Sequence, residues 1–458
     1  MNKLYIFGIG GTGSRVLKSL TMLLAAGVKC DYDIVPIIVD PDAANANLTD
    51  TVATLRRYQQ IRKLISFNEN TKNEFFRTDI QDTLNGFRMP LEQTNQKFSS
   101  FINLAGLSPA NQALSQMLFS ERNLSADMQV GFKGNPNIGC VVMNQIATQP
   151  KFKDFANSFQ SGDKIFIVSS IFGGTGASGF PLLLKTFRTN QALPNFKLIN
   201  GSEIGAISVL PYFSVKQSNS SSIDSSTFIS KTKSALAYYE KNLSDIDYLY
   251  YIGDDSYPVY NNNEGGTSQN NDANFIELLA ASAIIDFSKT AKQAAPVYKE
   301  LGMKDIKQGQ SVSFETFCSG LDSMLHKPMT RLVLFANYIK THFDKFQTLS
   351  LSIKAQFDQN FLTGPFVGDL KSFLSDYLNW LEQMEKNKRP LKLFNLQCGN
   401  KPFNVVEGVK PASVFSTKSD YDLFDSRLNS VSSSSSKEPL LMEAFFVAID
   451  GLINDKKL

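Results

Sequence analysis

KIFIVSSIFGGTGASGFPLLLKTFR, residues 164–188, decides the fold of this chain. Its apolar, β-branched beginning predicts a buried strand at Lys164–Ser170, and the glycines after it predict a tight turn. We expect a helix to open near Ser178, with Pro181 in its first turn. Glycines let backbone N–H groups approach an anion and a helix N-terminus adds a favourable dipole, so this layout is typical of a phosphate cradle. An ordinary strand-to-helix turn has the same local pattern, and a second such turn is needed to favour the cradle.

The second glycine-rich turn lies at the start of the chain. Leu4–Phe7 predicts a buried strand that runs into GIGGTGS at residues 8–14, and apolar residues at helical spacing follow. Ile34–Val39 predicts the next strand, which ends in Asp40-Pro41-Asp42. Strand, glycine loop, helix, strand and acid in this order predict an α/β fold, with a Rossmann-like, mostly parallel sheet between helices.

Composition excludes several classes of protein. The chain has 458 residues, 42% hydrophobic and 19% charged, which indicates a folded protein of more than one ordinary core. Its net charge of +3 is not concentrated in a basic domain, so we expect no nucleic-acid partner. Four scattered cysteines without a CxxC pair fit a reducing compartment and no zinc site. We find no signal peptide and no long apolar run, and expect a cytoplasmic protein without a membrane span.

The chain divides into four predicted parts. Residues 1–290 form a nucleotide-binding domain that includes an apolar helix at residues 274–287. Residues 291–429 form a C-terminal domain that is either α/β or helical, in which amphipathic helices are expected; the fold class as a whole takes this second domain to be helix-rich. Residues 430–437 contain SVSSSSS, a serine-rich linker, and residues 438–458 form a final helix.

Four loops follow the predicted strands in a defined order. They are Gly8–Gly13, Asp40–Asp42, then GNPNIG at residues 134–139, and GGTGA at residues 173–177. Together they resemble the tubulin/FtsZ superfamily over roughly residues 1–290, and most of all its divergent bacterial tubulin-like members. One such motif is weak evidence, but four in order form a fairly specific signal.

The resemblance implies a bound GTP or GDP whose phosphates lie between the two glycine loops, with Mg²⁺ on the side of Asp42. Hydroxyls of Thr12 and Thr175 and backbone amides of the glycines would contact phosphate oxygens. No residue is assigned as a dedicated metal ligand. The residues that the resemblance assigns to the nucleotide are Gly10, Gly11, Thr12, Gly13, Asp40, Asp42, Asn135, Gly173, Gly174, Thr175, Gly176, Ala177, Asp254 and Phe275.

The chain departs from the family pattern around the base and at the catalytic loop. Asp254 stands where the family has an asparagine that reads the base, and Phe275 takes the place of the aromatic residue that stacks on it. The family's NxDxxD loop, which the next subunit contributes, aligns with Ser311–Thr316, where both acids and the asparagine are replaced. Glu315 is the one candidate catalytic residue, as a base that orients water. The chain is therefore expected to hydrolyse GTP slowly or not at all.

Three functions remain open at this point. The first is a GTP-binding protein that self-associates head to tail into nucleotide-dependent filaments. The second is a nucleotide-binding scaffold or sensor that does not polymerise and works with protein partners. The third is a ThiF-like adenylating enzyme or a Rossmann NAD-dependent enzyme, which explains Gly8–Asp42 but leaves Gly134–Gly139 and Gly173–Gly176 unexplained.

Overall fold

A parallel sheet forms the centre of the protein. The computed structural model describes residues 1–128, 131–132, 134–216, 225–255, 258–261, 266–304, 306–307, 309–346, 353–398, 402–406, 420–429 and 436–456. Within these residues a seven-stranded sheet has the order β3-β2-β1-β4-β5-β7-β9, and every neighbouring pair is parallel. Its strands are β1 (Lys3–Ile9), β2 (Asp33–Val39), β3 (Arg88–Met89), β4 (Lys164–Ser170), β5 (Ile204–Val209), β7 (Tyr248–Ile252) and β9 (Val297–Glu300).

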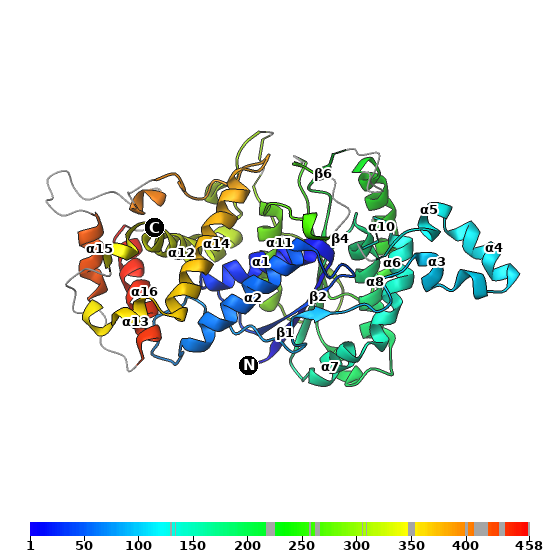
Figure 1. Cartoon of the computed structure of the whole chain (residues 1–458), viewed down its shortest axis with the longest axis horizontal. Coiled ribbons are helices and arrows are strands. Elements are labelled where there is room, and N and C mark those ends of the chain that lie inside the picture. Colours follow the sequence, from blue (N-terminus) through cyan, green and yellow to red (C-terminus); the bar gives the residue numbers. More distant parts are fainter. Residues whose placement is uncertain are drawn as a thin grey trace.

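Helices cover both faces of this sheet (Figure 1). One face carries α1 (Gly10–Ala25), α2 (Ala46–Leu64) and α11 (Phe275–Ser288). The other carries α6 (Pro136–Met143), α7 (Pro150–Ser158), α8 (Gly174–Thr189), α9 (Phe196–Gly201) and α10 (Phe228–Asn242). Because helices cover both faces of the sheet, its central strand β4 is buried at every position. Strands in such a sheet are mostly apolar, as the centre of β4 is. The expected α/β fold is confirmed.

The boundaries of the decisive segment agree only in part with the sequence-based prediction. The strand at Lys164–Ser170 is confirmed, but α8 begins at Gly174 rather than near Ser178. The prediction was wrong because it placed all the glycines in a loop. The glycines instead form the first helical turn of α8, which is packed against β4. A Cβ atom on Gly176 would lie 2.6 Å from the carbonyl oxygen of Ser170, so this close packing requires a glycine. Pro181 consequently lies in the helix interior.

The C-terminal part of the described chain is rich in helices. It contains α12 (Ser319–Phe346), α13 (Gln359–Leu362), α14 (Pro365–Glu385), α15 (Asp420–Leu428) and α16 (Lys437–Lys456), which gather at one end of the molecule (Figure 1). β9 pairs with β7, so the chain contributes to the main sheet after residue 290 as well. The domain boundaries themselves stay predictions, and residues 430–435 of the serine-rich linker lie outside the described residues.

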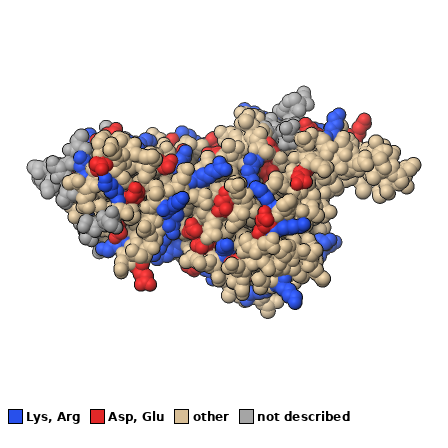
Figure 2. All heavy atoms as spheres, turned by 60° about the horizontal axis from the view of Figure 1, so that its bottom comes forward, with Lys and Arg blue, Asp and Glu red and all other residues tan. Residues whose placement is uncertain are grey.

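An arm projects from the opposite end of the molecule (Figure 1). It is built from α3 (Phe98–Phe101), α4 (Pro109–Leu118) and α5 (Glu121–Leu124). Residues 98–120 contain no charged side chain, and the arm is largely uncharged in Figure 2, where Lys and Arg elsewhere alternate with Asp and Glu. A small parallel pair, β6 (Ser214–Val215) with β8 (Val259–Tyr260), stands above the main sheet. Among the described helices we find none with the length and hydropathy required to cross a bilayer.

Candidate functional site

The order of the strands places a cleft between β1 and β4. The chain runs from β1 outward to β2 and β3, then returns to the other side of β1 with β4. At such a reversal the two following loops diverge, and ligands of open parallel sheets bind in the crevice at the carboxyl ends of the strands. Both glycine turns leave the sheet at this position, because one follows β1 and the other follows β4.

The two glycine turns touch each other. Gly10 has a φ of +70°, a backbone conformation that a glycine adopts without strain. A Cβ atom on Gly10 would lie 3.5 Å from Cβ of Thr175 and 4.0 Å from the backbone nitrogen of Gly176. The two motifs, more than 160 residues apart in sequence, therefore form adjoining walls of one cleft.

The cleft combines backbone, hydroxyl and charged groups. Its lining within the described residues consists of Gly10, Gly11, Thr12, Arg15, Asp40, Asp42, Asn45, Gly131, Phe132, Gly134, Ser170, Phe172, Gly173, Gly174, Thr175, Gly176, Phe213, Val215, Phe228, Asn261, Gln269 and Asn271. α1 and α8 both begin here, and neither has a capping side chain on its first turn. The first N–H groups of a helix have no partner within the helix, so the ends of α1 and α8 offer donors and positive dipoles to the same space.

The Gly/Asn/Pro loop forms the third wall. A Cβ atom on Gly174 would lie 3.0 Å from the backbone nitrogen of Asn135 and 3.2 Å from that of Gly134, so this loop lies directly against the second glycine turn. Gly131, Phe132 and Gly134 line the cleft. Asn135 is the residue before α6 and stands behind Gly174, outside the lining.

Two acids end β2 and line the cleft. Oδ1 of Asp40 accepts a hydrogen bond from the N–H of Asp42 at 2.9 Å, and Oδ1 of Asp42 accepts from the N–H of Ala44 at 3.1 Å. Burial raises the pKa of Asp40 to about 7, and the negative charge of Asp42 acts in the same direction. Near neutral pH, Asp40 therefore repels an anion less than an ordinary carboxylate does, and it can ionise beside a cation.

A loop that comes late in the chain closes the side of the cleft next to these acids. The N–H of Gly266 donates to Oδ2 of Asp42 at 2.6 Å, and Nδ2 of Asn45 donates to Oε1 of Gln269 at 2.6 Å. The N–H of Asn271 donates to Oδ1 of Asn47 at 3.1 Å. These bonds join the loop before α11 to the β2–α2 connection, and no local sequence pattern predicts that these two segments meet.

Arg15 is a cleft residue that the sequence analysis missed. It is the only Lys or Arg in the described lining, and it is 6% exposed. Nε donates to Oε1 of Glu277 at 2.5 Å, and Nη2 donates to the hydroxyl of Tyr212 at 2.6 Å. One signal for it was present, because Arg15 is the single charged residue between Leu4 and Leu17 in a stretch otherwise expected to be buried.

Some of the expected nucleotide residues stand outside the cleft. Gly13 packs on the strand, since a Cβ atom there would lie 2.4 Å from the carbonyl carbon of Gly8. Ala177 follows the lining residues in α8 and does not reach the cleft. Phe275 is 1% exposed in the first turn of α11, where it packs in the core. For Gly13 and Phe275, close packing between elements explains the residue without a ligand.

Asp254 and Glu315 also lie elsewhere. Both carboxylate oxygens of Asp254 accept from Nε of Arg389, at 2.9 and 3.1 Å, so its acid joins the end of β7 to the segment after α14. Glu315 lies on the surface after β9, and its backbone carbonyl accepts from Nζ of Lys304 at 2.8 Å. Within one copy of the chain, neither residue belongs to the described lining of the cleft.

The described residues contain no group of three or more His, Cys, Asp and Glu side chains placed to hold a metal ion. A cation in the cleft would thus have Asp40 and Asp42 as its carboxylate neighbours and would need further oxygen ligands from a bound molecule.

Comparison with known proteins finds only distant likenesses. No family model matches this chain, and no curated protein matches it. Similar solved structures include CetZ1 from Haloferax volcanii as a GDP-bound monomer, with 14% identity and a TM-score of 0.28 over 56% of this chain and 52% of that one. CetZ from Methanosaeta thermophila strain DSM 6194 has 13% identity and a TM-score of 0.25, over 55% and 46% of the two chains.

A third similar structure is CetZ2 from Haloferax volcanii as a GTPgS-bound protofilament. It has 12% identity and a TM-score of 0.30, over 63% of this chain and 57% of that one. The match to each of these proteins thus spans about half of its length. TM-scores at this level assign no family and no ligand to this chain.

Proposed function

We propose that the cleft binds a guanine nucleotide, GTP or GDP, with its phosphates between the two glycine turns. The contact between Gly10 and Thr175 at the reversal point of the sheet is the observation that supports this most directly. Two uncapped helix N-termini, two threonine hydroxyls and one arginine surround the same space. Such a set of donors suits a chain of phosphate oxygens, for which charge-assisted hydrogen bonds are the strong ones.

The acids at the end of β2 suit a Mg²⁺ ion that accompanies the phosphates. Carboxylate oxygens are preferred by this hard cation, which is usually bound through one or two carboxylates together with substrate phosphates. Oδ2 of Asp40 has no hydrogen-bond partner among the described residues, while Oδ1 is bonded to the N–H of Asp42. Asp40 is therefore the better placed of the two acids to face a cation.

The resemblance of the sequence motifs to the tubulin/FtsZ superfamily extends this proposal to assembly. A divergent bacterial tubulin-like protein of the cytoplasm would associate head to tail, and the next copy would bring its residues 311–316 to the nucleotide. Glu315 is exposed, as a residue of such a contact must be in the free chain. Since it is the only acid in that segment, we propose weak or absent hydrolysis, and a non-polymerising scaffold if no filament forms.

Titration of the purified protein with GTP, GDP, ATP, NAD and guanosine tests the ligand. We expect GTP and GDP to bind at least tenfold more tightly than guanosine, because the phosphates supply most of the contacts. Sedimentation at increasing protein concentration, with and without GTP, tests assembly. Failure of all nucleotides to bind at millimolar concentration would overturn the proposal, and small particles at every concentration would leave only the scaffold.

A Rossmann NAD-dependent enzyme is the second candidate, and one observation favours it. The strand order β3-β2-β1-β4-β5 is also that of dinucleotide-binding domains, in which the first glycine turn and the acid after β2 hold the ligand. Tighter binding of NAD than of GTP in the same titration would select this function.

A further inference from the structure

The guanidinium of Arg15 is held in the floor of the cleft by groups from two other elements. Arg15 extends from α1 toward Glu277 in the first turn of α11 and toward Tyr212, which follows β5. The hydroxyl of Tyr212 also donates to Oε1 of Glu277 at 2.8 Å, and the N–H of Asn274 donates to Oε2 at 3.1 Å. Glu277 is 1% exposed. The arginine is thereby fixed in position as well as neutralised.

One edge of this guanidinium is left over. Nε is bonded to Glu277 and Nη2 to Tyr212, whereas Nη1 has no hydrogen-bond partner among the described residues. Nη1 lies 3.5 Å from the position that a Cβ atom on Gly11 would take, and Nδ2 of Asn45 lies 3.9 Å from the same position. The donor without a hydrogen-bond partner therefore lies against the first glycine turn, on a side chain that is more than nine-tenths buried and lines the cleft.

A purely structural role does not account for this arrangement. Replacing a buried ion pair by apolar side chains of similar volume is often neutral or stabilising, so a link between α1 and α11 does not require charges. Burial raises the pKa of Tyr212, which keeps its hydroxyl protonated, and the three side chains together carry no net charge. A fixed donor that faces an open, glycine-lined space is explained by an anionic oxygen that occupies this space.

We propose that Nη1 of Arg15 donates directly to a phosphate oxygen of the bound ligand, on the Gly11 side of the cleft, opposite Thr175. This inference rests on the proposed function and assigns a binding residue to it. Glu277 and Tyr212 are positioning residues, which hold the planar fork of the guanidinium at the angle that a phosphate needs. The ligand class is accordingly a nucleoside diphosphate or triphosphate rather than a nucleoside.

The test uses the full chain and two variants, one that removes both buried charges together and one that neutralises the acid but keeps an oxygen that can accept from Nε of Arg15. The double variant Arg15→Met/Glu277→Met removes both charges with little change in volume, and Glu277→Gln alone keeps the arginine. GTP, guanosine and inorganic pyrophosphate are the probes, and thermal unfolding without ligand verifies that each variant is folded. We expect the double variant to bind GTP and pyrophosphate about 10- to 100-fold more weakly, the loss of one charge-assisted bond, with guanosine unchanged.

Glu277→Gln distinguishes a ligand-binding role of Arg15 from a role only in joining α1 to α11. If Arg15 only joined α1 to α11, both variants would weaken the cleft alike and guanosine would be lost with GTP. We expect instead that Glu277→Gln binds pyrophosphate at least as tightly as the natural chain, because the arginine charge is no longer neutralised. A folded double variant that binds GTP and pyrophosphate normally would overturn the inference.

The same probes distinguish this failure from failure of the proposed function. A natural chain that binds pyrophosphate but no nucleotide would end the nucleotide proposal, while loss of pyrophosphate in the double variant would still support Arg15. A natural chain that binds none of the probes would overturn both.

Discussion

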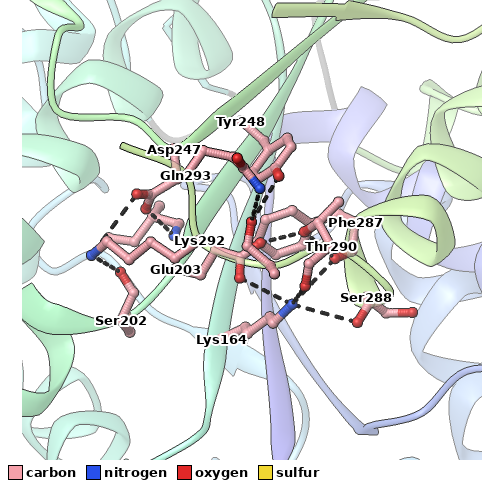
Figure 3. Close-up of polar contacts among 12 residues, drawn as sticks. Lys164, Ser202, Glu203, Asp247, Tyr248, Phe287, Ser288, Thr290, Lys292 and Gln293 are labelled. Carbon is pink, nitrogen blue, oxygen red and sulfur yellow. Dashed lines mark hydrogen bonds and ion pairs between the residues drawn. The ribbon is translucent and has the colours of Figure 1, made fainter. Parts of the chain in front are cut away.

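The two ends of the central sheet treat charge in opposite ways. At the carboxyl end of β1 and β4, glycines, uncapped helix ends and one edge of Arg15 are left open to a cleft. At the amino end of β4, β5 and β7, charged side chains form ion pairs and hydrogen bonds with one another (Figure 3). β4 thus begins in a closed polar network and ends at the open cleft.

The closed network is centred on Lys164, the first residue of β4. Its Nζ lies 3.1 Å from Oε2 of Glu203 and donates to the carbonyl oxygen of Thr290 at 2.6 Å (Figure 3). Beside it, Nη2 of Arg188 lies 2.7 Å from Oδ2 of Asp247, which also accepts from the N–H of Ile204 at 2.7 Å. These bonds join the starts of neighbouring strands to the segment after α11, so this network serves the fold.

The two ends of the sheet each contain a buried ion pair, and the two pairs differ in their hydrogen bonds. Lys164 with Glu203 and Arg15 with Glu277 are both less than a tenth exposed. Nζ of Lys164 is bonded to the acid and to backbone carbonyls. In Arg15, Nε and Nη2 are bonded, whereas Nη1 has no hydrogen-bond partner among the described residues. A buried charged group whose hydrogen bonds are complete has no donor left for a ligand, whereas one with a donor left over in a cleft is placed to bind.

The largest effect is expected from breaking the closed network. Lys164→Met leaves Glu203 buried without its cation, which costs about 3–5 kcal/mol of the free energy of unfolding. Denaturant unfolding measures this loss. Lys164→Met/Glu203→Gln is the matched control and should recover most of it, while GTP affinity of the folded protein stays unchanged in both. A Lys164→Met variant of normal stability would contradict the structural role given to this end of the sheet.

A smaller and different effect is expected at the open end. Gly176→Ala places a methyl group 2.6 Å from the carbonyl oxygen of Ser170, which must shift the first turn of α8 away from β4. We expect GTP to bind about tenfold to a hundredfold more weakly, as backbone bonds to phosphate are lost. Gly201→Ala, where no atom lies within 4 Å, is the control for a neutral glycine substitution. Equal GTP affinity in the two variants would remove the second glycine turn from the site.

The smallest effect concerns pH. The pKa of Asp40 is raised to about 7 by burial, so its carboxyl is mostly neutral at pH 6 and mostly negative at pH 8. The added charge should weaken binding of Mg²⁺-free GDP by about threefold across this range, from Coulomb repulsion in a watery cleft. Asp40→Asn removes the part of the pH dependence of GDP binding that comes from Asp40, while the part that comes from the phosphates of GDP remains. Identical pH profiles for the two proteins would show that Asp40 does not face the phosphates.

Local sequence was sufficient for the strands and turns around the cleft. β4 was predicted to the residue, because its apolar run at residues 165–168 begins after a lysine and ends in two serines, shortly before the glycines. The first glycine turn and the acids after β2 followed from the same kind of pattern. The starts of α1 and α8 were both misplaced, at Gly10 and Gly174, because nothing local distinguishes glycines that form a helical turn from glycines that precede it.

The sequence by itself determined the strands at residues 4–7, 34–39 and 164–170, the positions of the glycine motifs and the acids after β2, since each depends on neighbouring residues. Only the tertiary structure decided that Gly10 meets Thr175, that Asp254 serves Arg389, and that Arg15 meets Glu277 across 262 positions. Such pairs depend on the order of the strands in the sheet. The periodicity of the sequence does not predict which strands become neighbours in the sheet. Once two segments are neighbours, a buried charge needs a partner of opposite charge, and that partner comes from whichever segment lies beside it.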